Sequence, residues 1–312
     1  MNMKKKIFLF ALFLWALLIG TGYLVGNYFV NYALMRGSDG SPPPACAKIA
    51  DPNLKAPHLP KALGVREDWN ILSSDGLNLR AVCLHPKLEH PHRWAVLVHG
   101  YGRNKDFTWD YAEEYLKEGY VTLSPDLRGA GDSEGTYLTM GDKESDDLKL
   151  WIEEILRHDP DAKIVLHGVS MGAATVMTAS AKDLPSNVTA IIEDCGYTSA
   201  YDMFTAQLDK LFHLPETPIM PCVDIVCRQK TGVSLSYPTP LDCVAESSIP
   251  ILFIHGDADK LVPFEMMQTL YEASAASVKE RFIVHGAGHA SAKNANPKAY
   301  FRKVFAFLEP RM

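Results

Sequence analysis

A serine between two glycines is the residue of this chain best placed for covalent chemistry. Segment 168–172 reads Gly-Val-Ser-Met-Gly; it follows the apolar run 163–167 and precedes a stretch of small residues that favours a helix. This order predicts a buried strand, a sharp turn that exposes Ser170, and a helix whose N-terminal N–H groups stabilise a developing oxyanion. Glycine is expected on both sides because a Cβ at Gly168 or Gly172 would collide with the neighbouring strand or helix.

A serine hydroxyl is a poor nucleophile at neutral pH and needs a base that is oriented by an acid. His289 is the expected base, because it stands in a glycine-rich loop after the last predicted strand. The loop after the preceding strand offers two acids, Asp257 and Asp259. We predict that Asp259 orients the histidine and that Asp257 caps the turn by an Asx-type hydrogen bond. Asp194, at the end of an earlier strand, is a poorer candidate.

Two backbone amides are expected to bind the oxyanion. One is the N–H of Met171, which follows the serine, and the other is the N–H of Tyr101 in the loop 99–102, at the end of a predicted strand. This arrangement predicts acyl transfer to water through an acyl-serine intermediate. The chemistry requires no organic cofactor and no metal, and no further ligands with zinc spacing stand near Cys222 and Cys227.

Short apolar runs alternate with amphipathic stretches along most of the chain. The pattern predicts an α/β fold with a mostly parallel sheet covered by helices on both faces. A hairpin is expected at 65–72 and 79–85, strands at 94–99, 120–124, 163–167, 188–193, 250–255 and 280–284, and helices at 110–118, 142–157, 173–182, 265–275 and 297–308.

The interval 196–248 breaks this alternation. An insertion there would lie over the carboxyl ends of the strands, where open parallel sheets bind their ligands. We interpret about 197–248 as a small cap, although an extended connection with no part in the site is the alternative. Its apolar side chains could line an acyl pocket or form the core of the cap: Tyr197, Tyr201, Phe204, Phe212 and Leu214.

The N-terminus has the pattern of a membrane anchor. Lysines 4–6 precede a stretch without charges, and residues 7–26 are long enough to cross ~30 Å of hydrocarbon as a helix. Only Arg36 follows closely, so the charges favour an inside N-terminus and an extracytoplasmic catalytic domain. A cleaved signal peptide is the alternative, but its small-x-small pattern at 45–47 lies well beyond the apolar run. The prediction is thus a single-pass signal-anchor protein of the cell membrane.

The chain is expected to divide into three parts. Residues 1–36 are the predicted anchor, 37–62 a linker that begins with flexible Gly and Ser and stiffens through prolines, and 63–312 the catalytic domain. The net charge of −6 gives no broad basic surface and argues against a nucleic-acid partner. Six cysteines allow disulfides in an oxidising compartment, but buried unpaired thiols are equally consistent with the pattern.

These motifs resemble the α/β-hydrolase superfamily, and in particular its bacterial membrane-anchored members of the serine aminopeptidase and monoacylglycerol lipase-like branch. The Ser…Asp…His order is typical of that superfamily and differs from the common serine-protease orders. The resemblance extends from residue 65 to the C-terminus. Its matching segments are 98–102, 126–133, 168–172, 255–263 and 286–290.

The resemblance also assigns a supporting role to one loop. In segment 126–133, Arg128 and Asp132 are expected to hold neighbouring loops near the site. The family usually has histidine where Ala130 stands, so no role is carried over to that position. His167, which precedes the serine turn, is expected to be a packed strand residue.

Together the residues and the resemblance predict a serine hydrolase of the carboxylesterase or lipase class. Its substrate would be a small-molecule acyl ester, either short-chain or lipid-derived, hydrolysed at the membrane surface. A peptidase or amidase, an acyltransferase, and a membrane-tethered binding module without activity are the alternatives on the same fold. Ser170 argues against dehalogenase or epoxide hydrolase chemistry, for which an aspartate would be expected there.

Overall fold

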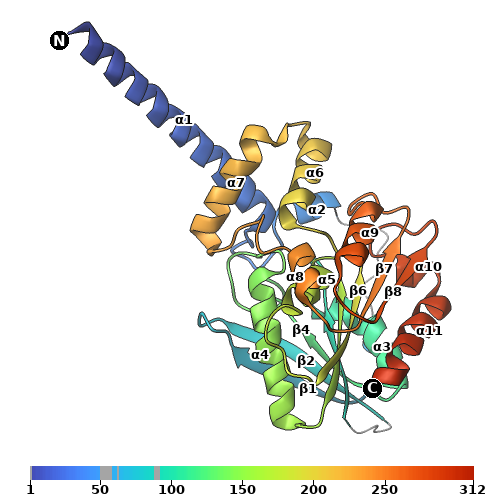
Figure 1. Ribbon diagram of the computed structural model, residues 1–312. Coiled ribbons are helices and arrows are strands. Elements are labelled where there is room, and N and C mark those ends of the chain that lie inside the picture. The colour runs from blue at the N-terminus through green and yellow to red at the C-terminus, as the bar shows by residue number, and fades with distance from the viewer. Residues whose placement is uncertain (1, 50–57, 62, 88–91) are drawn as a thin grey trace.

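A single mixed sheet forms the centre of the protein (Figure 1). The computed structural model describes residues 2–49, 58–61, 63–87 and 92–312. In these ranges the sheet has eight strands in the order β1-β2-β4-β3-β5-β6-β7-β8. Their bounds are β1 Leu63–Leu72, β2 Asn78–Pro86, β3 Arg93–Val98, β4 Val121–Pro125, β5 Lys163–Val169, β6 Val188–Asp194, β7 Ile251–Gly256 and β8 Lys279–Val284.

The strands from β4 to β8 pair in parallel, whereas β1, β2 and β4 pair antiparallel. Parallel strands are buried on both faces, which explains why β5 reads as a continuous apolar run. Alternate residues of β5 enter different cores: Ile164 and Leu166 pack on one face of the sheet, and Val165 and Val169 on the other. The predicted α/β fold, its hairpin and its parallel strands are confirmed.

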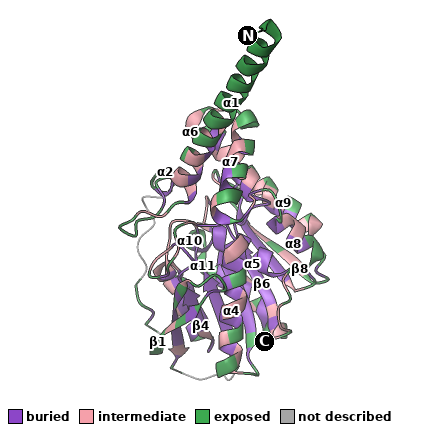
Figure 2. Ribbon diagram, turned by 90° about the vertical axis from the view of Figure 1, so that its left-hand side faces the viewer, coloured by how far each residue is buried: buried purple, intermediate pink, exposed green. Residues whose placement is uncertain are grey.

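Helices cover both faces of the sheet (Figure 2). Residues of α4, α5 and α9 pack in one core, and residues of α3 and α11 in the other. Their bounds are α3 Trp109–Lys117, α4 Asp142–His158, α5 Met171–Ala179, α9 Phe264–Ala273 and α11 Pro297–Leu308. These helices match the predicted ones, and their ends differ from the predicted ends by up to a few residues. The short helices α2 Cys46–Ile49 and α10 Ala292–Ala295 lie outside the prediction.

The interval between β6 and β7 is helical. It contains α6 Ala200–Phe212, α7 Glu216–Thr231 and α8 Pro240–Glu246, none of which the sequence pattern predicted. Pro218 and Pro221 make the sequence of α7 look unlike that of a helix. The first turn of α7 is kinked at Thr217. Helices α6 and α7 pack together past one end of the strands (Figure 1).

The first helix, α1 Met3–Leu34, projects from the domain and is long and apolar enough to cross a membrane (Figure 1). A signal sequence near the N-terminus can have the same length and composition. Its last turns differ from the expectation for a simple anchor, because Gly26, Val30 and Leu34 are buried against the domain. Figure 2 shows this change from exposed to buried along the helix.

The segment after α1 is packed on the domain rather than free. Met35 bridges to Tyr137, and the Arg36 guanidinium donates to the carbonyl oxygens of Ser133 and Gly131 at 2.6 Å each. Gly102 lies so near Cys46 that a Cβ there would meet the Cys46 sulfur at 2.6 Å. The expected flexible spacer at 37–44 is therefore flanked by anchored residues on both sides. Residues 50–57 and 62 of the predicted linker lie outside the described ranges.

All six cysteines fall within the described residues and are free thiols. Five are buried, and Cys222 is partly exposed. The alternative of unpaired thiols is thus the one that the structure shows.

Arg128 holds two neighbouring segments, as expected. Its guanidinium donates to both carboxylate oxygens of Asp147 in α4, at 2.7 and 2.6 Å, and to Asp75 in the β1–β2 turn, at 2.8 Å. The Arg128 and Asp147 side chains are only 4% and 3% exposed. Burial raises the pKa of Asp147 to about 6, although Arg128 opposes that shift. Asp132 also makes an ion pair, with Lys105 at 2.6 Å, but the Asp132 side chain is 76% exposed.

We predict that Arg128→Met lowers the thermal unfolding midpoint by about 10 °C, because a buried carboxylate left without its partner costs about 3–5 kcal/mol. Circular dichroism melts measure the shift. Arg157→Met is the matched control, since Arg157 is 69% exposed and its pair with Glu154 should contribute little. Equal shifts for the two variants would contradict the importance of the buried pair.

Candidate active site

Ser170 stands on a strained turn between β5 and α5. Its φ of 58° and ψ of −116° lie outside the regions that residues with a Cβ normally adopt. The flanking glycines allow the close packing that holds it: a Cβ on Gly168 would meet the Gly172 carbonyl oxygen at 2.1 Å, and one on Gly172 would meet the Val98 carbonyl oxygen at 2.1 Å. The local structure is the sharp strand-to-helix turn expected from the sequence.

The structure brings Ser170, His289 and Asp259 together. The Ser170 hydroxyl lies 2.8 Å from His289 Nε2, to which it can donate its proton. His289 Nδ1 lies 2.8 Å from Asp259 Oδ2. The serine follows β5, the aspartate follows β7 and the histidine follows β8, so the carboxyl ends of three parallel strands supply the three groups. Such a chain of hydrogen bonds can transfer a proton from the serine to the imidazole.

Asp259 is held as a carboxylate acceptor. Its Oδ1 accepts from the backbone N–H groups of Leu261 and Val262, at 2.8 and 3.0 Å. Burial opposes its ionisation, but hydrogen bonds from His255 and His289 lower its pKa below the usual value for aspartate. An ionised Asp259 can accept a hydrogen bond from His289 Nδ1.

Asp257 does not cap its own turn, so that expectation was wrong. Its carboxylate accepts from the Gly286 N–H and lies next to His285 Nδ1, both at 2.7 Å. It therefore ties the loop after β7 to the loop that carries His289. The carboxylate of Asp194 accepts from the Tyr300 hydroxyl at 2.8 Å, and no hydrogen bond to His289 is seen among the described residues.

Two buried titratable residues close to Asp259, Glu193 and His255, were not predicted. His255 Nε2 lies 3.3 Å from Asp259 Oδ2 and 3.1 Å from the Val262 carbonyl oxygen. Glu193 accepts from the Gly196 N–H through one oxygen, and its other oxygen has no partner among the described residues. Burial raises the pKa of Glu193 to about 8. The signal was present in the sequence, since each residue interrupts the apolar pattern of a strand beside the site.

His167 is the packed strand residue that we expected. Its two ring nitrogens lie 3.0 Å from the hydroxyls of Tyr115 and Tyr300. Burial lowers the pKa of His167 to about 3, so the ring is neutral at physiological pH.

The expected oxyanion donors flank the serine. Met171 is the first residue of α5, so its N–H has no carbonyl partner within the helix. Gly100 approaches closely enough that a Cβ there would meet Ser170 Cβ at 3.2 Å, which brings the loop containing Tyr101 beside the serine. His99 Nε2 accepts from the Leu127 N–H at 3.1 Å and fixes this loop.

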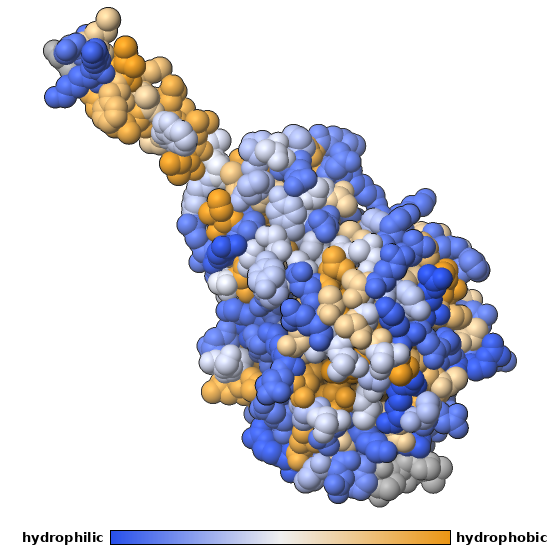
Figure 3. Space-filling view, in the orientation of Figure 1, coloured by the Kyte–Doolittle hydropathy of each residue, from blue (hydrophilic) through white to orange (hydrophobic). Residues whose placement is uncertain are grey.

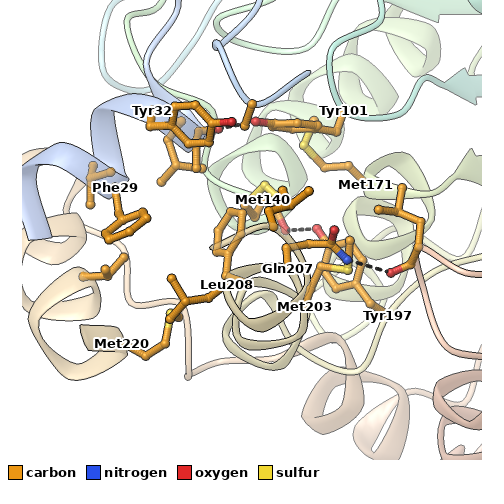
Figure 4. A pocket seen from close by; sticks show the side chains of 18 of the residues that line it. Phe29, Tyr32, Tyr101, Met140, Met171, Tyr197, Met203, Gln207, Leu208 and Met220 are labelled. Carbon is orange, nitrogen blue, oxygen red and sulfur yellow. Dashed lines mark hydrogen bonds between the residues drawn. The ribbon is translucent and has the colours of Figure 1, made fainter. Parts of the chain in front are cut away.

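An apolar cavity opens beside Ser170 (Figure 4). Two tyrosines that line it have their hydroxyls engaged by carbonyl oxygens, Tyr197 with Met140 and Tyr101 with Ala33, so their rings are left to face the cavity. Of the cap residues considered from the sequence, Tyr197, Phe204 and Phe212 line the cavity, whereas Tyr201 and Leu214 pack against the core. The cavity also includes residues of α1, which the sequence analysis treated only as an anchor.

Two groups of potential metal ligands occur among the described residues. Glu67, Cys83 and His85 lie on the β1–β2 hairpin, and Cys195 lies beside Asp259 and His289. Burial raises the pKa of both thiols, which makes them poor ligands because metals bind thiolates. In the second group, the aspartate and histidine are already hydrogen-bonded to each other.

The raised pKa of Glu193 predicts a pH-dependent stability. The ordinary pKa of glutamate is 4.5, so between pH 4.5 and 8 an unfolded chain is ionised there while the folded protein keeps the proton. The free energy of unfolding should therefore fall with rising pH in that window, by about 1.4 kcal/mol per unit from this group alone, and level off above pH 8.

Glu193→Gln should reduce this slope because it cannot ionise. Thermal melts between pH 6.5 and 9 compare the two proteins, with Glu280→Gln as the control at a partly exposed glutamate. If the melting temperatures of wild type and Glu193→Gln change with pH to the same extent, Glu193 does not titrate as inferred.

Family models match two overlapping parts of the chain. Residues 89–209 match the model described as "Serine aminopeptidase, S33", and residues 195–296 match a model described as serine hydrolase (FSH1). The first ends within α6 and includes Ser170, while the second includes Asp259 and His289. The two models thus divide the predicted site residues between them.

The chain is similar in sequence to bacterial proteins and in structure to an archaeal esterase. The chain is 26% identical to YqkD of Bacillus subtilis over 216 residues, which cover 69% of this chain and 70% of the relative. It is also 26% identical to YfhR of Escherichia coli over 195 residues, and spans 61% of that protein. The esterase Pf2001 of Pyrococcus furiosus superposes with a TM-score of 0.64 at 22% identity, over 81% of this chain and 99% of the esterase. The chain accordingly has the α/β-hydrolase fold, and two parts of its sequence resemble serine hydrolases.

Proposed function

We propose that the protein hydrolyses carboxylic esters with Ser170 as nucleophile, His289 as general base and acid, and Asp259 as the group that orients the histidine. The observation that carries the proposal is the pair of 2.8 Å contacts that link Ser170 through His289 to Asp259. The serine also borders an apolar cavity that suits an acyl chain.

The reaction would have two halves. His289 takes the proton of the Ser170 hydroxyl as its oxygen bonds to the ester carbonyl carbon, and the N–H groups of Met171 and Tyr101 bind the resulting oxyanion. The imidazolium returns the proton to the departing alkoxide, which leaves as an alcohol. A water molecule then attacks the acyl-serine, gives its proton to His289, and releases the carboxylic acid with the serine restored.

The peptidase alternative has one observation in its favour, the match to the serine aminopeptidase model. An aminopeptidase must bind a free, positively charged amine close to the scissile bond. The described residues that line the cavity include no aspartate or glutamate, and Gln207 is among the few polar side chains there. An uncharged acyl group fits this lining better than an ammonium group does.

The rest of the chain is assigned by the same proposal. Residues 1–36 would anchor the protein in the cell membrane, and 63–312 would form an extracytoplasmic catalytic domain with a cap at about 197–248. The length and apolar surface of α1 support the anchor, and the position of α6 over the cavity supports the cap.

Ser170→Ala should lower kcat/KM for p-nitrophenyl acetate by at least about a thousandfold, because the acyl-enzyme can no longer form. Asp259→Asn should also cause a large loss, since it removes the charge that orients and stabilises the imidazolium. Release of p-nitrophenol measures both effects.

Ser180→Ala is the matched control, because Ser180 is a buried serine at the other end of α5 and bonds only within that helix. Comparison with p-nitroanilide and free-amine peptide substrates separates the two functions. Faster cleavage of an aminoacyl p-nitroanilide than of any ester would favour the peptidase.

A further inference from the structure

The end of the first helix forms part of the cavity beside Ser170. Phe29 and Tyr32 of α1 face this cavity together with Leu208 of α6 (Figure 4). Val30, Ala33 and Leu34 also line it. A segment that only attached the domain to a membrane would not be expected to line the cavity beside Ser170.

This part of α1 is fixed from two sides. The Phe29 ring packs edge-on against Phe212 of the cap, with ring centres 5.2 Å apart, and Tyr32 packs on the same ring at 5.6 Å. On the other side, the Tyr101 hydroxyl donates to the Ala33 carbonyl oxygen. Tyr101 is the residue whose backbone N–H we assign to the oxyanion, so α1 contacts both the cap and the catalytic loop.

A close helix crossing sets the position of α1. A Cβ on Gly26 would meet the Cys222 carbonyl oxygen of α7 at 2.4 Å, so only glycine allows this approach. The crossing lies one turn before Phe29, and it holds the rest of the helix along the cap.

The same crossing marks where the exposed apolar part of α1 ends (Figure 3). Residues 7–24 extend roughly 27 Å as a helix, which is close to the ~30 Å thickness of the hydrocarbon core. Phe29 follows this stretch by five residues, or roughly 8 Å of helix. Tyr23 and Tyr28 are exposed at this level, where tyrosines favour the membrane–water interface. The cavity would therefore lie next to the bilayer surface.

We infer that residues 29–34 of α1 form the wall against which the acyl chain of the substrate binds, so that the anchor helix itself determines acyl specificity. The substrate class is an acyl ester long enough to reach this wall, taken up from the membrane surface beside the helix. This inference rests on the proposed function, because it concerns the acyl group that Ser170 would accept.

The test uses full-length protein in phosphatidylcholine liposomes with p-nitrophenyl acetate and p-nitrophenyl octanoate. Ala33→Phe places a ring in the cavity, and should lower kcat/KM for octanoate at least tenfold while acetate hydrolysis changes less than threefold. Ala16→Phe is the control, with the same substitution on the same helix at an exposed position in the apolar stretch.

A second pair of variants tests the inference even if Ala33→Phe does not fold. Phe29→Ala enlarges the cavity and should shift the preference among acyl esters toward longer chains. Tyr28→Ala removes the neighbouring, 56% exposed ring, which does not line the cavity, and should leave the preference unchanged.

An octanoate-to-acetate ratio that stays at the wild-type value in both Ala33→Phe and Phe29→Ala would overturn the role of α1 and leave the esterase proposal intact. If the wild type hydrolyses neither ester, the proposed function fails. The wall is then tested by the rates at which ethyl and octyl fluorophosphonates label Ser170. A selective loss of octyl labelling in Ala33→Phe would support the wall, and equal rates would refute it.

Discussion

The strained turn at Ser170 is the constraint on which the site depends. A serine at a φ of 58° is held there because β5, α5 and β3 pack so closely at Gly168 and Gly172 that neither position has room for a Cβ. That packing fixes the hydroxyl at the carboxyl end of the sheet and aims the first N–H groups of α5 at the same point. The loops after β7 and β8 then have to supply only a histidine and an acid within reach.

Burial determines the charges of the acids around this point. Asp259 stays ionised because it accepts two backbone N–H bonds and lies next to two histidines, whereas Glu193, with fewer donors, has a raised pKa. The contrast shows that hydrogen bonds outweigh burial at one carboxyl and not at the other. The Asp259 carboxylate thus carries its negative charge where the proposed mechanism uses it.

Local patterns were enough to predict the sheet, the serine turn and the three residues that meet there. These features depend on short-range requirements: apolar runs for buried strands, glycines for the turn, and polar residues at strand ends. Of the helices between β6 and β7, α7 was missed because prolines interrupt its first turns. Glu193 and His255 were missed because their importance comes from burial, which a local pattern does not reveal. The role of α1 was missed because its contacts with Phe212 and Tyr101 join distant segments.

The most direct test of the account is to trap the acyl-enzyme. Wild-type protein is mixed with p-nitrophenyl butyrate, quenched in acid within milliseconds to seconds, digested and analysed by mass spectrometry. The account predicts one butyryl group on the peptide that contains Ser170, and none there in Ser170→Ala. Rapid ester hydrolysis with the acyl group on another residue would contradict it, and so would the same activity in Ser170→Ala.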